Sequence, residues 1–203
     1  MRPHAQSEPG PARIGPNAVA QTLHALERRE GRGLADEVRA RCELPPQLPD
    51  ALVPETWFVD LVEALRAQLP PGQAEATLQE GGARTASYVA ARRIPTPVRV
   101  ALRWMPRRVA LPLLLRAFAE HAWTFAGAGE FAVDGPYPGT ITLRNAPTCR
   151  RPGAPGGAYY AAAFEGLLQI AAPGARVREI ACQAQGADRC RFVIDLGADR
   201  AAS

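Results

Sequence analysis

The feature that most constrains this chain is the gathering of cysteines in its last third. Three of the four cysteines, Cys149, Cys182 and Cys190, lie there together with Glu179. The segments around Cys182 and Cys190 alternate apolar and polar residues, and a short glycine-containing turn separates them. This pattern is typical of two paired strands. We therefore expect the Cys182 and Cys190 sulfur atoms to approach each other.

These four side chains are candidate zinc ligands. Zinc takes thiolates, imidazoles and carboxylates, usually four of them in a tetrahedron. Cys149, Glu179, Cys182 and Cys190 would supply such a set. The alternative is that the cysteines are small buried hydrophobic residues, which is common for free cysteine. Spacing alone leaves both interpretations open.

Residue periodicity divides the chain into a helical N-terminal half and a ββαββ unit. Two strand-like segments flank the turn 134–139, a helix is predicted over 156–172, and strands follow at 177–183 and 189–196. Successive strands joined by short turns pair antiparallel. We therefore predict an α+β protein with a mostly antiparallel sheet.

The N-terminal half is predicted to be helical between proline-rich and glycine-rich breaks. Residues 1–12 and 198–203 are expected to be disordered tails. Residues 13–45 predict two amphipathic helices, which form a dimer contact or pack on their own domain. Residues 46–197 are expected to form a single domain. Its long helix contains Gly81–Gly82, each costing ~1 kcal/mol relative to alanine, which indicates close packing or a closely approaching ligand.

A further helix, predicted over 113–126, carries one apolar face. Leu114, Phe118, His121 and Phe125 lie three or four residues apart on it. An imidazole on such a face is either an axial ligand to a metal tetrapyrrole or a core histidine bonded to a backbone carbonyl. A lone histidine favours the second interpretation.

Charge and motifs exclude several classes of protein. The net charge of +4 is carried by arginine, without any lysine, in clusters at 92–93, 99–103 and 107–108. These clusters lack the interleaved aromatic residues of a nucleic-acid interface, so we expect no nucleic-acid partner and favour an acidic small molecule or a membrane surface. No run of apolar residues is long enough for a spanning helix or a signal peptide, so a cytoplasmic protein with reduced thiols is expected. No nicotinamide or flavin fingerprint, P-loop, G-x-S-x-G or H-E-x-x-H motif is present.

Four short motifs resemble the 4-vinyl-reductase domain family. They are Asn145-Ala-Pro147, Gly166-Leu-Leu168, Glu179-x-x-Cys182 and Gly186-Ala-Asp-Arg-Cys-Arg-Phe192. The signature covers residues 130–196. Over its whole length the chain is similar to the members of this family that serve bacteriochlorophyll biosynthesis.

The resemblance implies an α/β sandwich like that of haem-based nitric-oxide sensors and trafficking-complex subunits. Family members bind small hydrophobic molecules between helices and sheet, and often dimerise. In some, a structural zinc is held by a cysteine, a Glu-x-x-Cys pair and a further cysteine, which match Glu179, Cys182 and Cys190 here. The first cysteine of the family would fall near Gly156 or Gly157, and Cys149 is the only candidate for its place.

Together these patterns predict a protein that binds a magnesium tetrapyrrole intermediate and carries it to the enzymes of the pathway. A homodimer and a place at the periphery of the photosynthetic membrane are further expectations. The alternatives are the vinyl reductase itself and a ligand-sensing or structural subunit. The expected pocket combines apolar periodicity with the resemblance, and its residues are Leu114, Phe118, His121, Phe125, Tyr159, Tyr160 and Phe164.

Overall fold

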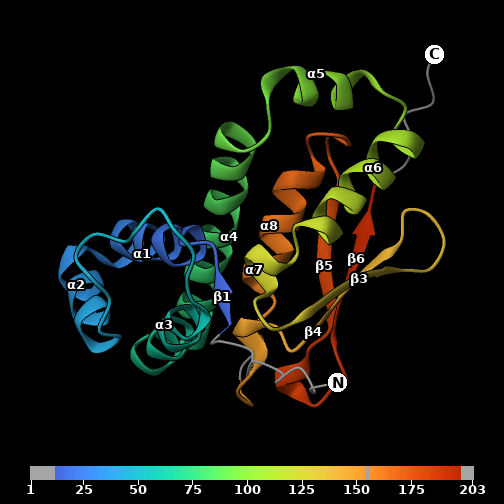
Figure 1. Cartoon of the computed structure of the whole chain (residues 1–203). Coiled ribbons are helices and arrows are strands. Elements are labelled where there is room, and N and C mark those ends of the chain that lie inside the picture. The colour runs from blue at the N-terminus through green and yellow to red at the C-terminus, as the bar shows by residue number, and fades with distance from the viewer. Residues whose placement is uncertain (1–11, 154–155, 198–203) are drawn as a thin grey trace, which may run out of the picture.

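The computed structural model describes residues 12–153 and 156–197 (Figure 1). The two predicted tails therefore lie outside the described residues, apart from Ala12. The helices are α1 (Asn17–Glu30), α2 (Arg32–Arg41), α3 (Glu55–Gln68), α4 (Pro71–Arg92), α5 (Thr96–Trp104), α6 (Arg107–Glu120), α7 (Trp123–Ala126) and α8 (Ala158–Leu168), with 3-10 turns η1 (Pro147–Cys149) and η2 (Gln183–Gln185). The strands are β1 (Arg13–Ile14), β2 (Val53–Pro54), β3 (Glu130–Asp134), β4 (Thr140–Arg144), β5 (Arg176–Ala181) and β6 (Cys190–Asp195).

Four strands form one antiparallel sheet in the order β3-β4-β6-β5. With α8 between β4 and β5, this is the predicted ββαββ unit, and the α+β class is confirmed. Along β6, Cys190, Phe192 and Ile194 are buried while Arg191 and Asp195 are exposed. The alternation shows that one face of the sheet is covered, and α6, α7 and α8 lie on that face in Figure 1.

Glycines let α4 approach its neighbours on two sides. A Cβ at Gly82 would lie 2.0 Å from the Tyr159 carbonyl oxygen in α8, and a Cβ at Gly81 would lie 2.7 Å from Thr22 Oγ1 in α1. A Cβ at Gly166 of α8 would lie 2.7 Å from Ala86 Cβ. The glycines inside the helix therefore serve close packing, which is one of the two interpretations the sequence left open.

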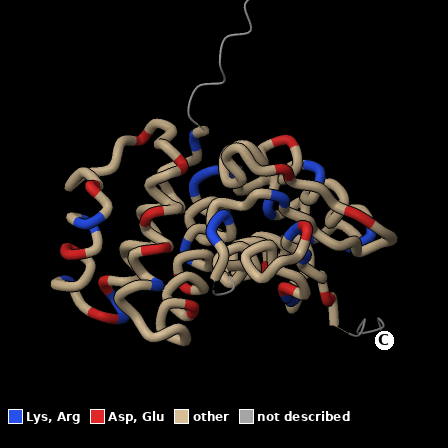
Figure 2. Tube along the Cα trace, turned by 90° about the horizontal axis from the view of Figure 1, so that it is seen from below, with Lys and Arg blue, Asp and Glu red and all other residues tan. Residues whose placement is uncertain are grey.

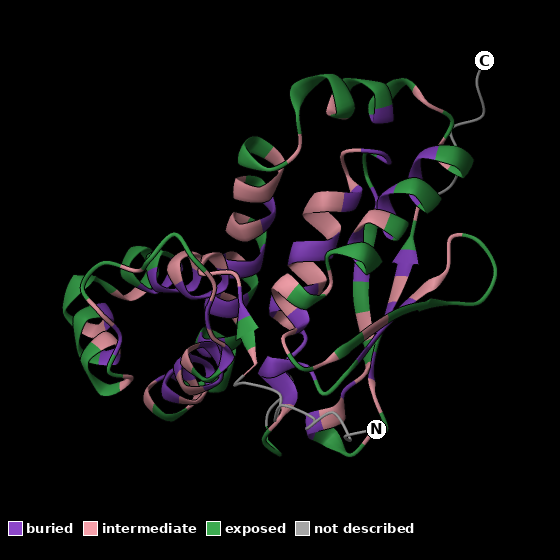
Figure 3. Ribbon diagram, in the orientation of Figure 1, coloured by how far each residue is buried: buried purple, intermediate pink, exposed green. Residues whose placement is uncertain are grey.

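The N-terminal helices bury their apolar faces in the core of this chain. Val19, Leu23 and Leu26 of α1 and Val38 of α2 are almost completely buried (Figure 3). β1 pairs with β2, and the Gly15 N–H donates to Thr124 O, which ties the start of the chain to α7. This packing satisfies the predicted amphipathic faces, and a dimer contact stays a prediction.

The helix predicted over 113–126 is in fact two helices. α6 begins directly after Pro106, contains Pro112 and ends at Glu120, and α7 starts at Trp123. Pro112 does not end α6, because it lies early in the helix with its ring exposed to solvent. The continuous face expected from Leu114 to Phe125 is thus interrupted at His121. Among the described residues, no helix is both long and apolar enough to span a membrane.

Candidate functional site

The four candidate ligands meet at one place beneath α8. Cys149 comes from η1, Glu179 from β5, Cys182 from the residue before η2, and Cys190 from the start of β6. One ligand atom from each lies within 4.8 Å of all the others. The Sγ atoms of Cys149 and Cys182 are 3.6 Å apart. Four such groups at this separation fit the ligand number and type that zinc prefers.

The turn between β5 and β6 places Cys182 and Cys190 side by side. The register between these strands shifts between Glu179 and Ala181. After η2, Gly186 takes a left-handed conformation (φ 92°), which glycine adopts without strain. The Gln183 N–H then points at Cys190 Sγ at 3.3 Å. The strand-turn-strand expectation from the sequence is therefore confirmed.

Helix α3 positions Cys149 from the opposite side. The Arg66 side chain donates from Nη2 to Thr148 O at 2.9 Å. The Arg150 guanidinium pairs with both oxygens of Glu55, which is 3% exposed. Glu55 Oε2 also accepts from the Ala128 N–H at 3.0 Å. Arg66, Glu55 and Arg150 thus hold the loop that carries the fourth sulfur.

Sequence reasoning missed this ion pair. Arg150 and Glu55 are 95 residues apart, and no local pattern joins them. The one signal in the sequence was a carboxylate at position 55, directly before the apolar face of α3 and after Val53. A buried carboxylate requires a partner, because desolvation of an unpaired charge is costly.

Gly156 and Gly157 explain why the fourth ligand comes from elsewhere. A Cβ at Gly157 would lie 2.1 Å from Glu179 Cδ, and a Cβ at Gly156 would lie 2.2 Å from Thr148 O. Neither position has room for a cysteine side chain in this arrangement. Cys149 reaches the cluster instead, several residues earlier than in the family pattern.

The electrostatics of the cluster fit a cation. Hydrogen bonds from the Cys149 and Cys190 thiols, and from the Gly156 and Ala184 amides, lower the pKa of Cys182 far below its usual value. Donating to the Cys182 sulfur raises the pKa of Cys149 to about 12. Burial, followed by the adjacent Cys182, raises the pKa of Glu179 to about 8, and Glu179 Oε1 has no hydrogen-bond partner among the described residues. A divalent ion would replace the shared protons and satisfy this oxygen.

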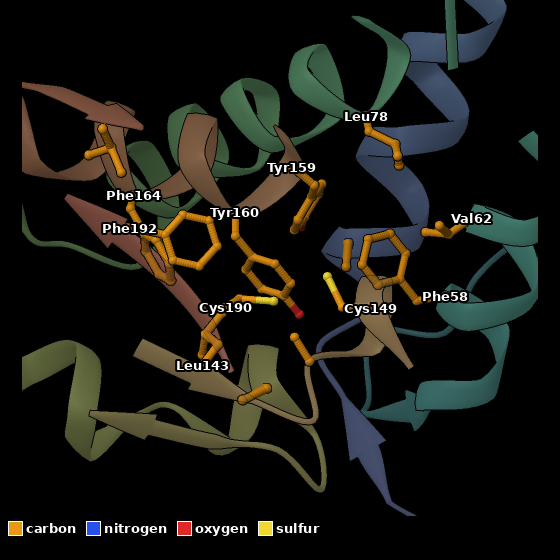
Figure 4. Packing of buried hydrophobic residues seen from close by; sticks show 14 of the residues in the cluster. Phe58, Val62, Leu78, Leu143, Cys149, Tyr159, Tyr160, Phe164, Cys190 and Phe192 are labelled. Atoms are coloured by element: carbon orange, nitrogen blue, oxygen red, sulfur yellow. The ribbon is translucent and has the colours of Figure 1, made fainter. Parts of the chain in front are cut away.

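The predicted pocket residues form an aromatic cluster between helices and sheet (Figure 4). Phe164 of α8 lies at its centre, with its ring centroid 6.1 Å from Phe118, 5.9 Å from Phe125 and 5.6 Å from Phe192. Tyr160 stacks on Phe164 at 5.9 Å and donates its hydroxyl to Phe125 O. The structure therefore brings most of the predicted residues together, but their own rings fill the space between them.

The remaining predicted residues take different places. Leu114 is buried beneath α6, and Tyr159 is buried on the α4 side of α8, where its hydroxyl donates to Thr85 Oγ1 at 3.0 Å. His121 is exposed at the C-terminal end of α6, with Nδ1 2.9 Å from Ala117 O. The contact with a backbone carbonyl fits the core-histidine interpretation, but the exposure of the residue does not. A role for His121 as an axial ligand stays a prediction.

Two open grooves lie outside the aromatic cluster. One, of about 730 Å³, runs between α4, α8 and the edge strand β5, and Glu75, Glu165 and Glu179 make it acidic. The other, of about 390 Å³, lies at the start of α6 and is lined by Arg107, Arg108, Tyr137 and Leu196 among others. An anionic ligand would favour the second groove on charge.

The fold and the cysteine cluster define a protein of the 4-vinyl-reductase domain family, and the model of that domain matches residues 140–196. The chain is 37% identical over 192 residues to the bacteriochlorophyll synthase 23 kDa chain of Cereibacter sphaeroides, covering 91% of this chain and 93% of that protein. It is 35% identical over 188 residues to the corresponding protein of Rhodobacter capsulatus, covering 90% and 86%. The chain belongs to the family of these 23 kDa chains.

Solved structures with the same fold are H-NOX proteins. An H-NOX protein from K. algicida, in the Fe(II) unliganded state, aligns with a TM-score of 0.60 at 10% identity over 90% of this chain and 96% of that chain. One from S. oneidensis, in the Fe(II)NO ligation state, aligns with a TM-score of 0.52 at 15% identity, covering 90% and 98%. At this identity the likeness establishes the fold alone, and it confirms the predicted similarity to the nitric-oxide-sensor fold.

Proposed function

We propose that this chain acts in bacteriochlorophyll biosynthesis, where it binds a magnesium tetrapyrrole intermediate and presents it to enzymes of the pathway. The observation that carries the proposal is the similarity, over about nine-tenths of the chain, to two proteins named as chains of bacteriochlorophyll synthase. A chain of a synthase has to contact other pathway proteins. We infer that it works in the cytoplasm at the periphery of the photosynthetic membrane.

The proposed pigment site is the aromatic cluster beneath α6. Flat aromatic side chains and aliphatic residues suit a porphyrin ring, and ligand sites are mostly apolar with a few polar groups that fix orientation. The basic groove of Arg107 and Arg108 adjoins the start of α6 and would take the carboxylates of the pigment. Phe118, Phe125 and Phe164 are packed together here, so binding requires α6 to move away from the sheet. That movement would also bring His121 within reach of the pigment metal.

We also propose that Cys149, Glu179, Cys182 and Cys190 hold a structural zinc. The unpartnered oxygen of Glu179 and the three closely spaced thiols support this assignment. When bound, zinc would fasten η1, β5 and β6 to one another. These elements form the wall beneath α8, so the metal would stabilise the floor of the pigment site without contacting the pigment.

The vinyl reduction implied by the domain's name is the alternative function. Reduction of a vinyl group needs a hydride or electron donor that must be held beside the pigment. Turnover of a divinyl substrate by the purified chain with NADPH or reduced ferredoxin would replace the carrier proposal.

Titration of the purified protein with magnesium protoporphyrin tests the proposal directly. We expect a shift of the Soret band and a change in fluorescence at micromolar protein. Phe118→Ala and the double variant Arg107→Gln/Arg108→Gln should weaken binding about tenfold or more, because each removes part of the proposed site. Arg32→Gln/Arg41→Gln on α2 is the matched control and should bind like the parent. Absence of any spectral change with the parent protein would refute pigment binding.

A further inference from the structure

Helix α5 exposes most of its apolar face to solvent. At 100° per residue, Val98, Val100, Ala101 and Trp104 fall on one side of the helix and Arg99 and Arg103 on the other. Val98 is 46% exposed, Val100 51% and Trp104 82%, and only Leu102 of this helix is buried. Figure 3 shows α5 as almost continuously exposed. An amphipathic helix normally buries this face, so α5 is a surface that another body can cover.

The charge around α5 has one sign. No Asp or Glu occurs between Glu80 and Glu120, and eight arginines fall in that interval. Arg92, Arg93, Arg103 and Arg108 form no salt bridge with any other described residue. Figure 2 looks at the molecule from the end opposite α5 and shows acidic and basic residues interspersed there. The end that carries α5 is therefore both apolar and basic.

We propose that α5 docks this protein onto the surface of a bilayer that contains anionic lipids. Helices that lie in a membrane interface combine an arginine-rich polar face with tryptophan and aliphatic residues on the other face. Tryptophan favours the headgroup level because its ring is amphipathic. Trp104 would insert among the headgroups beside Val98 and Val100, while Arg93, Arg103 and Arg108 would lie over lipid phosphates.

Charge favours a lipid surface over a second copy of this chain. Pairing two α5 helices face to face would bring two arginine-rich segments together without carboxylates between them, and like charges repel at such distances. An anionic bilayer supplies the opposite charge over a wide area, and each basic residue near such a surface adds a comparable increment of attraction. The complementarity thus selects the bilayer as the occupant of this face.

The location of α5 adds to the proposed function without depending on it. α5 connects α4 to α6, and α6 covers the aromatic cluster (Figure 1). Docking through α5 would place the start of α6 and its basic groove at the membrane surface. A hydrophobic pigment could then pass between the bilayer and the protein. Lipid binding itself needs no pigment, so it can be measured with the pigment-free protein.

Co-sedimentation with vesicles tests this inference. We expect the full chain to bind vesicles of phosphatidylcholine mixed with phosphatidylglycerol, to bind pure phosphatidylcholine vesicles much more weakly, and to be released by high salt. Tryptophan fluorescence should shift to the blue on binding and should lose most of that shift in Trp104→Phe. Failure of the parent protein to bind the anionic vesicles at low salt would overturn the proposal, whatever its affinity for pigment.

Two double variants and one matched control locate the surface. Arg93→Gln/Arg103→Gln should weaken binding to anionic vesicles roughly 30-fold, the fold-change that corresponds to ~1 kcal/mol per basic residue. Val100→Ser/Trp104→Ser should weaken it by a similar factor at any salt concentration, and both variants should retain the circular dichroism spectrum of the parent because the replaced side chains are exposed. Arg32→Gln/Arg41→Gln removes the same charge from α2 and should bind normally. Equal losses in all three variants, or a concentration-dependent dimer that only the α5 variants abolish, would refute the lipid assignment.

Discussion

The carboxylate of Glu179 fills the space in which a side chain at Gly157 would begin. A Cβ at Gly157 would lie 2.1 Å from Glu179 Cδ, although the backbone there is ordinary (φ −77°). The residue is glycine because of this contact and not because of its conformation. The contact links the start of α8 to the candidate metal ligands.

Gly157→Ala should therefore weaken zinc binding by displacing Glu179. We expect the affinity to fall roughly ten- to hundredfold, the range found when the support of a metal ligand is lost. Competition with a chromophoric chelator measures this change. Gly72→Ala is the control, because nothing lies within 4 Å of its added Cβ. An unchanged affinity in Gly157→Ala would remove Glu179 from the ligand set.

The purified protein should contain zinc, and Cys182→Ser should lose both the metal and thermal stability. Binding of zinc by the folded state alone makes the binding free energy part of the folding free energy, so a chelator should lower the Tm of the parent and not that of Cys182→Ser. Metal analysis and thermal unfolding measure the two effects. Cys42→Ser is the control, since Cys42 lies outside the cluster and is half-buried. Parent protein free of zinc after expression with added zinc would contradict the assignment.

Gly82→Ala should be strongly destabilising. The added Cβ would lie 2.0 Å from the carbonyl oxygen of Tyr159, and a backbone atom in the middle of a packed helix cannot move away cheaply. We expect a loss of about 3 kcal/mol in the free energy of unfolding, as for overpacked cores. Gly33→Ala has open space around its Cβ and should gain up to ~1 kcal/mol from helix propensity. Urea unfolding compares the two, and similar values would show that α4 and α8 are further apart.

Arg150→Met should cost far more than Arg151→Met. Arg150 neutralises Glu55, which is almost completely buried, so its loss leaves an unpaired buried carboxylate and costs about 3–5 kcal/mol. Arg151 pairs with Asp60 on the surface, where an ion pair contributes about 0–1 kcal/mol. Unfolding by urea distinguishes the neighbours. Rescue of Arg150→Met by Glu55→Gln would support the argument, and equal costs would contradict it.

Tyr159 should make the protein sensitive to alkali. Burial raises the pKa of the Tyr159 hydroxyl above its usual value of 10.0, so the folded state holds this proton more tightly than the unfolded state. The resulting stability is complete below about pH 10 and is lost as the pH rises above it. Tyr159→Phe should flatten the dependence of the free energy of unfolding on pH in that range. Tyr137→Phe is the control at a partly exposed tyrosine, and an equal flattening there would contradict the prediction.

The sequence by itself determined the elements and the chemical types at the candidate metal centre. Alternating residues around Cys182 and Cys190 predicted the paired strands, and the motif Glu179-x-x-Cys182 with Cys190 predicted which side chains would gather. These features are local, because a two-residue period and a short turn fix neighbouring positions without help from the rest of the chain.

Only the tertiary structure decided how distant parts complete these sites. Cys149 becomes the fourth member of the cluster because Arg66 and Glu55, both on α3, hold its loop, and neither contact has a local signature. His121 leaves the apolar face because α6 ends one residue earlier, and α5 stays exposed because nothing else in the described chain covers it. Periodicity reports which face of a helix is apolar, but the packing of remote elements decides whether that face is buried, joined to a site or left for a membrane.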